Sequence, residues 1–149
     1  MHHRISLWAA AVLSLVLAQA PARAGDLSVT VEGVVGSEGE IEAILYPGED
    51  AWLDNDHPGT LKRRVAAADA VDGVVTLVFD KLDPGPYALA IYHDADMSGE
   101  LERGFMWAPK EGWAFSNNIT PRFGPPNYKK AKLDVGEDEV VTTVQLDYP

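Results

Sequence analysis

The chain has 149 residues, of which 23 are Asp or Glu and 12 are Lys or Arg, so its formal net charge at pH 7 is −11. An acidic chain of this length corresponds to one domain and is repelled by nucleic acid and by anionic membrane surfaces. The absence of cysteine excludes a disulfide framework and a lipid-modified cysteine, so stability has to come from a hydrophobic core or from a bound metal.

The first 24 residues have the composition of a signal peptide. Residues 1–4 form a short basic stretch, residues 5–18 form an uncharged and largely apolar run, and Ala22 and Ala24 occupy the two positions that a signal peptidase reads. The run is shorter than the roughly 20 apolar residues that a membrane anchor needs. We therefore predict cleavage after Ala24, a single domain over residues 25–149, and a periplasmic or secreted protein. Loss of Arg4 and Arg23 would leave ten basic against 23 acidic residues, a formal charge of −13.

Short apolar runs follow, separated by turns rich in Gly, Pro and Asp. Their spacing predicts about seven strands and no long amphipathic helix, which is typical of an all-β fold, here an antiparallel β-sandwich. Three consecutive basic residues at 62–64 favour an edge position for the third strand. The run 87–93 is apolar on both faces, so we place it at the centre of its sheet. We expect strands at 27–35, 41–46, 62–68, 74–79, 87–93, 131–135 and 140–146, the last two paired around residues 136–138.

An oxygen-rich loop begins where the expected central strand ends. Asp94, Asp96 and Ser98 offer side-chain oxygens at alternate positions, and Gly99 allows a sharp turn after them. The backbone carbonyl of Glu100 can supply a further oxygen. Calcium takes six to eight oxygen ligands at about 2.3–2.6 Å, and alternate residues of a tightly curled chain direct their side chains toward one centre. The loop is therefore a candidate calcium site.

The calcium pattern is incomplete at its twelfth position, where an EF-hand has a bidentate Glu and this chain has Phe105. Glu102, or Glu111 from farther along the chain, would have to complete the ligand set. A strand rather than a helix precedes the loop, so we do not expect an EF-hand. The alternative interpretation is an Asx-rich turn without a metal, in which the carboxylates accept hydrogen bonds from nearby backbone amides.

Several motifs follow one another in the second half of the chain. They are Pro84-Gly85 with Tyr87-Ala88-Leu89, His93-Asp94-x-Asp96-x-x-Gly99-x-Leu101, Pro109-Lys110-Glu111-Gly112, Phe115-Ser116-Asn117-Asn118 and Gly124-Pro125-Pro126. With these motifs the chain resembles the exported bacterial family called domain of unknown function 2141. The resemblance implies a periplasmic or secreted domain, similar in architecture to prealbumin-like and carboxypeptidase-regulatory-like sandwiches, with no established activity. The chain departs from the family at Asp96, Ser98 and Glu102, where the family tends to have Asn, Asn or Asp, and Asp.

The segment 103–128 has no strand or helix periodicity and is rich in aromatic residues. In one interpretation its rings cover one end of the sandwich, and residues 116–118 satisfy the loop backbone through their side chains. In the other, exposed rings of Trp107 and Trp113 form a ligand platform. Exposure of these two indoles would discriminate between the interpretations. The candidate ligand-binding residues are His93, Trp107, Glu111, Trp113, Asn117 and Asn118.

The residue types of a catalytic triad are present without a recognised arrangement. His93, Asp94 and Ser116 have suitable side chains, but the chain has no nucleophile elbow and no oxyanion signature. We expect His93 to hydrogen-bond a loop, and we assign no catalytic residue. The sequence favours a non-catalytic binding or adhesion module for an envelope or extracellular ligand, with calcium as the candidate cofactor and without nucleic acid or a stable membrane anchor. The alternatives are a structural or accessory envelope domain with a packed loop and no metal, and a small hydrolase.

Overall fold

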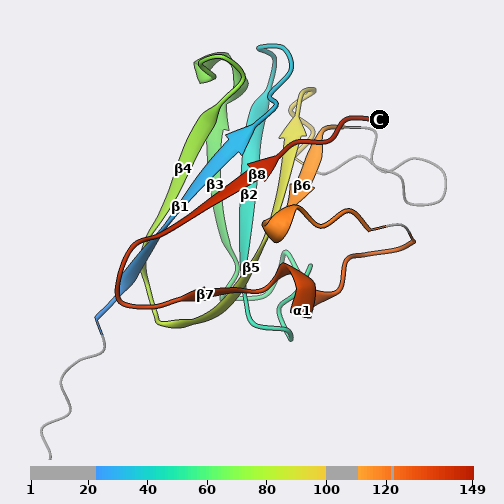
Figure 1. Cartoon of the computed structure of the whole chain (residues 1–149). Helices are drawn as coiled ribbons and strands as arrows, with labels where there is room; N and C mark the ends of the chain where they lie inside the picture. Colours follow the sequence, from blue (N-terminus) through green and yellow to red (C-terminus); the bar gives the residue numbers. More distant parts are fainter. Residues whose placement is uncertain (1–22, 100–110, 122) are drawn as a thin grey trace, which may run out of the picture.

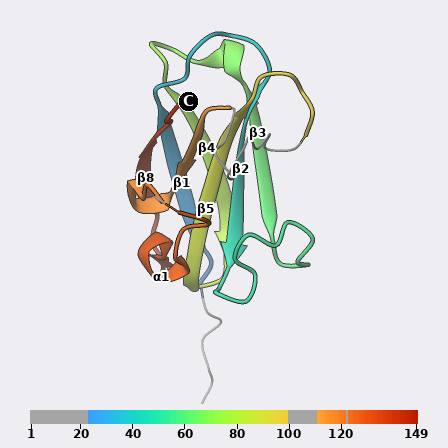
Figure 2. The same ribbon diagram turned by 90° about the vertical axis from the view of Figure 1, so that its right-hand side faces the viewer.

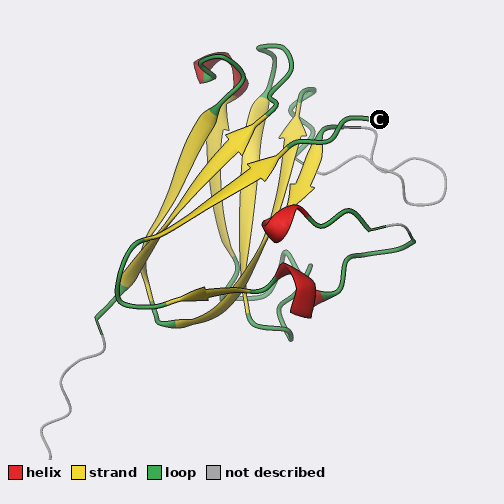
Figure 3. Cartoon of the chain, viewed as in Figure 1, coloured by secondary structure: helices red, strands yellow, loops and turns green. Residues whose placement is uncertain are grey.

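The computed structural model describes residues 23–99, 111–121 and 123–149. Figures 1 and 3 show that strands are the main regular structure of this part of the chain, with a few short helical turns between them. The elements in chain order are β1 (Gly25–Glu32), β2 (Glu40–Pro47), β3 (Leu61–Ala66), η1 (Ala67–Asp69), β4 (Val75–Leu82), β5 (Gly85–Asp94), β6 (Trp113–Phe115), η3 (Ser116–Asn118), α1 (Tyr128–Ala131), β7 (Leu133–Val135) and β8 (Val140–Gln145).

The strands form two sheets, and the expected all-β sandwich is confirmed. One sheet has the order β4-β1-β8, and the other has the order β3-β2-β5-β6 with β7 paired to the remaining part of β5. Strands β1 and β8 of the smaller sheet are inclined to β2 and β5 of the larger sheet in Figure 1, and Figure 2 shows the same sheets turned by 90°. All pairs are antiparallel except β1 with β8, which is parallel.

The core lies between the sheets because each strand turns alternate apolar residues inward. In β1, Leu27, Val29 and Val31 are fully buried, whereas Asp26 and Glu32 are exposed. Burial of a side chain of this size stabilises the fold by about 1.5–3 kcal/mol. The same core includes Ile41, Ala43, Leu45, Leu77, Phe79, Leu89, Ile91 and Val144.

Strand β5 is central, as the apolar pattern on both of its faces predicts. It pairs with β2 along one edge over eight residues, and with β6 and β7 along the other edge. Leu89 and Ile91 belong to the main core between the sheets, whereas Ala88 and Tyr92 belong to two smaller apolar clusters. Those clusters include Trp52 from the segment after β2 and Tyr128 from α1, so the outer face of β5 is covered as well.

The end of the chain differs from the expectation that 131–135 and 140–146 pair with each other. Strand β7 pairs with β5 in the larger sheet, and β8 pairs with β1 in the smaller one. The turn around residues 136–138 therefore crosses from one sheet to the other instead of closing a hairpin. The prediction was wrong because two adjacent strands separated by a short turn favour a hairpin by local rules, and the choice of partner depends on the whole sandwich.

Strand β6 lies inside the segment 103–128 that we expected to be irregular, and α1 begins at the last residue of that segment and ends at the first residue of the expected strand 131–135. Strand β6 pairs with Ala90, Ile91 and Tyr92, and α1 begins at Tyr128 after an Asn127 cap that accepts from the Lys129 amide. Both elements are too short for a periodicity to be recognised in the sequence. The first strand is also shorter than expected, because Gly33 takes a left-handed φ of 78° and the next amide, of Val34, donates to Gly73.

The third strand lies at an edge, as its basic residues indicate. Strand β3 pairs with β2 alone among the described strands. Arg63 extends from it to the other sheet, where its Nε atom donates to the Val78 carbonyl at 3.2 Å and its guanidinium lies 5.3 Å from the centre of the Phe79 ring. A long cationic side chain therefore covers this side of the sandwich and discourages pairing with another chain.

Ser116, Asn117 and Asn118 join the ends of several elements. Ser116 is fully buried, and its hydroxyl accepts from the Leu89 amide and donates to the Ala131 carbonyl. Asn117 donates to the carbonyls of residues 130 and 132. Asn118 donates to the carbonyl of residue 143 and accepts from the amide of residue 145, so its amide group takes the place of a neighbouring strand beside β8. The three residues therefore satisfy backbone groups by side-chain bonds, as the packed-loop interpretation proposes.

Replacement of Ser116 should destabilise the whole domain. Ser116→Ala leaves the Leu89 amide and the Ala131 carbonyl without their partner in a buried position, which costs about 1–3 kcal/mol. Urea unfolding of the mature protein measures this loss. The control is Ser37→Ala in the exposed turn before β2, which should change the free energy of unfolding by less than about 0.5 kcal/mol. Equal values for the two variants would contradict the assigned role of Ser116.

Candidate functional site

The loop after β5 is curled around the carboxylate of Asp94. This carboxylate is 4% exposed; its Oδ1 accepts from the Ser98 amide at 2.9 Å and its Oδ2 accepts from the Gly99 amide at 2.8 Å. Asp96 Oδ1 also accepts from the Ser98 amide, at 3.0 Å. Positive φ angles at Met97 and Gly99 tighten the curl. The carboxylates thus make the backbone bonds of an Asx-rich turn, which was the alternative to a metal loop.

The same loop places three carboxylates together. Oxygen atoms of Asp94, Asp96 and Glu111 all lie within 4.8 Å of one another. Hydrogen bonds from the Ser98 hydroxyl and amide lower the pKa of Asp96, so this carboxylate is ionised at neutral pH. Glu111 comes from the beginning of the segment that leads into β6, and it was one of the two acids expected to complete the oxygen set.

The other predicted oxygen ligands are only partly placed. The Ser98 hydroxyl lies 3.4 Å from Asp94 Oδ1, beside the carboxylate group. Glu100 and Glu102 lie outside the described residues, and so does Trp107 among the predicted ligand-binding residues. The structure therefore brings together Asp94, Asp96, Ser98 and Glu111.

His93 is a buried structural link at the end of β5. Its Nε2 atom lies 2.7 Å from the Glu38 carbonyl, which can only accept, so Nε2 carries the proton. Its Nδ1 atom lies 2.9 Å from the Tyr148 hydroxyl and accepts from it, and that hydroxyl accepts in turn from the Val35 amide. Ser116 makes its bonds to other groups. The histidine and serine that could have formed a triad thus belong to separate hydrogen-bond networks.

Close packing around Tyr148 fixes the start of β6. The Gly112 carbonyl accepts from the His93 amide at 2.8 Å. A side chain at Gly112 would have its first carbon 2.4 Å from the Tyr148 ring, so this position requires glycine. The C-terminal Tyr148 therefore holds both His93 and the chain between Glu111 and Trp113.

A buried charged network, which the sequence analysis missed, lies beside the loop on the outer face of the larger sheet. Glu42 on β2 is 1% exposed, and its Oε2 accepts from Arg64 Nε at 2.6 Å and from the Tyr92 hydroxyl at 3.0 Å. The same hydroxyl lies 3.2 Å from the Gly99 carbonyl, which links the network to the loop. Glu42 Oε1 has no hydrogen-bond partner among the described residues. The single acid in the apolar run 41–46 was the signal that could have identified this network.

Burial affects the chemistry of the network. The pKa of the Tyr92 hydroxyl is raised far above its ordinary value by burial, and then by the negative charge and the hydrogen bond of Glu42. The pKa of Arg64 is raised by its hydrogen bond to Glu42 and by the charge of that carboxylate. Tyr92 therefore remains a neutral donor, and Arg64 remains a cation that compensates the buried carboxylate.

Aromatic side chains continue along the same outer face. The rings of Trp113 and Phe115 on β6 are half-buried, with centres 5.5 Å apart, and Phe115 lies 6.0 Å from Trp52 in an edge arrangement. Trp52 also contacts Tyr46 and Tyr128 edge-on, and its Nε1 atom donates to the Pro126 carbonyl. The partial exposure of Trp113 leaves one face of this aromatic row accessible.

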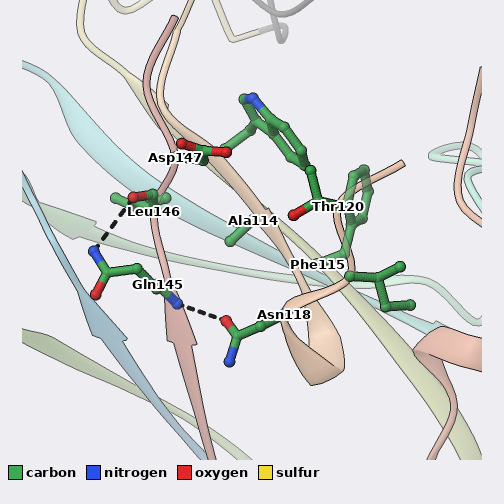
Figure 4. Close-up of a pocket in the computed structure, with 9 residues that line it drawn as sticks. Ala114, Phe115, Asn118, Thr120, Gln145, Leu146 and Asp147 are labelled. Carbon is green, nitrogen blue, oxygen red and sulfur yellow. Dashed lines mark hydrogen bonds between the residues drawn. The ribbon is translucent and has the colours of Figure 1, made fainter. Parts of the chain in front are cut away.

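A cavity of about 260 Å³ lies between β6 and the end of β8 (Figure 4). The main chain closes part of it, because Trp113 and Asp147 exchange two backbone hydrogen bonds of 2.9 and 2.8 Å. Asn118 and Gln145 lie at one end of the cavity in Figure 4, with Asp147 and Thr120 at the other. Of the predicted ligand-binding residues, Trp113 and Asn118 line the cavity, whereas Asn117 bonds to the α1–β7 connection. Sequence reasoning missed Asp147, which is far from β6 in the chain.

Comparison with known proteins assigns the chain to a protein family. The model of the DUF2141 family, described as an uncharacterized protein conserved in bacteria, matches residues 29–143. The chain belongs to this family. The match begins inside β1 and ends inside β8, so it covers both sheets and the loop after β5. No curated protein and no solved structure matches the chain. Within the described residues, none of the helices has the length and apolar character needed to cross a membrane.

The buried tyrosines predict a loss of stability at alkaline pH. Burial is the main cause that raises the pKa values of Tyr87, Tyr92, Tyr128 and Tyr148 in the folded state. In the unfolded chain a tyrosine loses its proton near pH ~10. The protonated tyrosines therefore contribute their full share to the free energy of unfolding below about pH 10. This contribution is lost as the pH rises through the higher pKa values of the folded state.

Urea unfolding between pH 8 and 11.5 measures this effect, and Tyr92→Phe provides the comparison. Each tyrosine that stays protonated only in the folded state lowers the free energy of unfolding by up to about 1.4 kcal/mol per pH unit. In the variant, the free energy of unfolding should fall less steeply above pH ~10, and it should be equally independent of pH below that value. Parallel curves for the variant and the parent protein would show that Tyr92 titrates normally.

Proposed function

We propose that this protein is an exported, non-catalytic binding module of the bacterial envelope or the extracellular space, and that its ligand occupies the cavity beside Trp113. The observation that carries the proposal is the cavity itself, which combines the half-buried rings of Trp113 and Phe115 with the polar groups of Asn118, Thr120 and Asp147. Ligand sites are typically concave and mostly apolar, with a few polar groups that fix orientation. The larger of the two sheets presents the two rings from β6, and the hydrogen bonds of Ser116 and Asn118 hold the chain directly after that strand.

We infer in addition that a divalent cation, with calcium as the best fit, binds Asp94, Asp96 and Glu111. Two oxygens bound to one calcium ion at about 2.3–2.6 Å can be at most about 5.2 Å apart. The three carboxylates meet this condition, because their oxygens lie within 4.8 Å of one another. Each carboxylate oxygen has two lone pairs, so the bonds that Asp94 accepts from Ser98 and Gly99 are compatible with a bound ion.

The cation and the cavity are connected through the main chain. Glu111 lies two residues before Trp113, and Gly112 between them is fixed by the His93 amide and the Tyr148 ring. An ion that holds Glu111 against Asp94 would therefore order the start of β6, which carries the cavity rings. Without an ion, three carboxylates at this separation repel one another and favour displacement of Glu111.

A structural or accessory envelope domain without a ligand is the second candidate. The observation in its favour is that Asn117 and Asn118 bond to the backbone and that both oxygens of Asp94 accept from loop amides. In this case the loop is simply packed against the end of the sandwich. The two candidates differ in the effect of calcium and in the response of the cavity to ligands.

Export rests on the N-terminal sequence and on the resemblance of the motifs to an exported family. The resemblance also supports a relationship to prealbumin-like and carboxypeptidase-regulatory-like sandwiches. Strand β1 begins at Gly25, directly after the expected cleavage site, so cleavage would leave all of the sheet intact. N-terminal sequencing of the protein recovered from bacterial envelope and culture fractions should find Gly25 first. Recovery of a form that still contains residues 5–18 would contradict export through this signal.

Calcium should raise the melting temperature of the mature protein relative to chelator. An ion that binds only the folded state adds about 2.7 kcal/mol of stability at 100 times its dissociation constant. For a domain of this size the melting shift is about 5–15 °C. Asp96→Asn with Glu111→Gln should remove most of the shift, because two neutral amides replace two charged ligands while Asp94 keeps its bonds to the loop.

The matched control is Asp138→Asn, which removes one negative charge from the exposed turn before β8. It should retain the calcium-dependent shift. The difference between calcium and chelator is compared within each variant, so a change in absolute stability does not affect the conclusion. If chelator does not change the melting temperature of the parent protein at physiological salt, the proposed metal site is wrong and the packed-loop alternative is favoured.

A further inference from the structure

The charge of the cavity lining points to the class of ligand. Its described lining residues include one charged side chain, Asp147, and no lysine or arginine. The carboxylate of Asp147 makes no hydrogen bond or ion pair with another group in the described part of the chain. The Asp147 backbone is nevertheless held firmly, because it exchanges two hydrogen bonds with Trp113. An unpaired, exposed negative group thus extends from a fixed backbone position beside an aromatic ring.

The rings next to this carboxylate supply the second half of a cation site. The negative face of an indole or phenyl ring attracts an organic cation, and the attraction is about 0.5–1 kcal/mol at exposed sites and about 2 kcal/mol when the cation loses water. Trp113 and Phe115 line the cavity together and are tilted by 55° to each other, so they present two non-parallel surfaces to the same space. The volume of about 260 Å³ lies just below the usual range of ligand cavities, so it suits only a small molecule or a single side chain.

We propose that the cavity binds an organic ammonium group, with its charge beside Asp147 and its carbon substituents against Trp113 and Phe115. The proposal rests on the binding function inferred above and names its ligand class. A protonated amine and a quaternary ammonium share this chemistry. Anions are disfavoured by Asp147 and by a net charge of −11. A neutral sugar could stack on the same rings, but its binding would depend less on the charge of Asp147.

Titration of the mature protein with choline chloride, followed by the NMR signal of the Trp113 indole N–H, tests the proposal. Chloride and ionic strength are held constant by replacing sodium chloride, and the variant Trp113→Phe assigns the signal. The neutral isostere 3,3-dimethyl-1-butanol is the matched ligand control, since it has the same shape without the charge. N-acetyl-lysine methylamide tests the protonated amine, and glucose tests the sugar alternative.

Choline should shift the Trp113 signal with a dissociation constant at least fivefold lower than that of the neutral isostere. Asp147→Asn keeps the backbone bridge and should remove this difference, whereas Asp138→Asn, which also removes one exposed negative charge, should preserve it. An unchanged melting temperature shows that the Asp147 variant folds. A stronger response to N-acetyl-lysine methylamide than to choline would identify a protonated amine as the preferred form of the same ligand class.

Four results would overturn the inference, and they separate it from the binding function. Equal affinity for choline and its neutral isostere, or choline binding that is unaffected by Asp147→Asn, would show a cavity that takes apolar groups and would leave the binding function in place. Binding of glucose alone would have the same consequence for the ligand class. No response of the Trp113 signal to any probe, with calcium or with chelator, would overturn both the ligand class and the proposed binding site.

Discussion

Strand β5 is hydrogen-bonded along both edges and covered on both faces, and the candidate site depends on this constraint. Its pairing with β2 fixes the position at which the strand ends, and therefore the place of His93 and Asp94. Its pairing with β6 brings Trp113 opposite Tyr92 and Phe115 opposite Ala90. Asp94 and Tyr92 thus lie on β5 itself, and the strand that carries the cavity rings is held against it. A backbone held in this way can keep a binding geometry that a free loop cannot.

The buried network of Glu42, Arg64 and Tyr92 joins the sheet to the loop. A buried carboxylate is costly unless it is paired, and here the pairing comes from a cation on β3 and a neutral donor on β5. The Tyr92 hydroxyl also lies within hydrogen-bond distance of the Gly99 carbonyl, while the Gly99 amide donates to Asp94. The position of the loop therefore depends on charges from three strands.

The same short stretch of chain serves both structure and the proposed binding. Ser116, Asn117 and Asn118 take the place of backbone hydrogen-bond partners for β5, α1 and β8, and they hold the end of β6 where its rings line the cavity. A packed loop and a ligand platform were alternatives in the sequence, but the structure combines the packed backbone with partly exposed rings. Both proposed sites adjoin β6. The calcium ligand Glu111 lies just before the strand, and Asp147 pairs with Trp113 at its outer edge.

The sequence by itself determined seven of the eight described strands, the central place of β5, the edge position of β3 and the cluster of oxygen-bearing residues after β5. Each of these follows from local information: apolar alternation, a run of basic residues, or the spacing of Asp94 and Asp96 along one turn. The parallel pairing of β1 with β8 and the separation of β7 from β8 were decided by the tertiary structure, because strand partners depend on the burial of two sheets together. For the same reason, the approach of Glu111 to Asp94 and of Asp147 to Trp113 was not predictable in detail. These contacts join segments far apart in the chain, and only the closed sandwich brings them within a few ångströms.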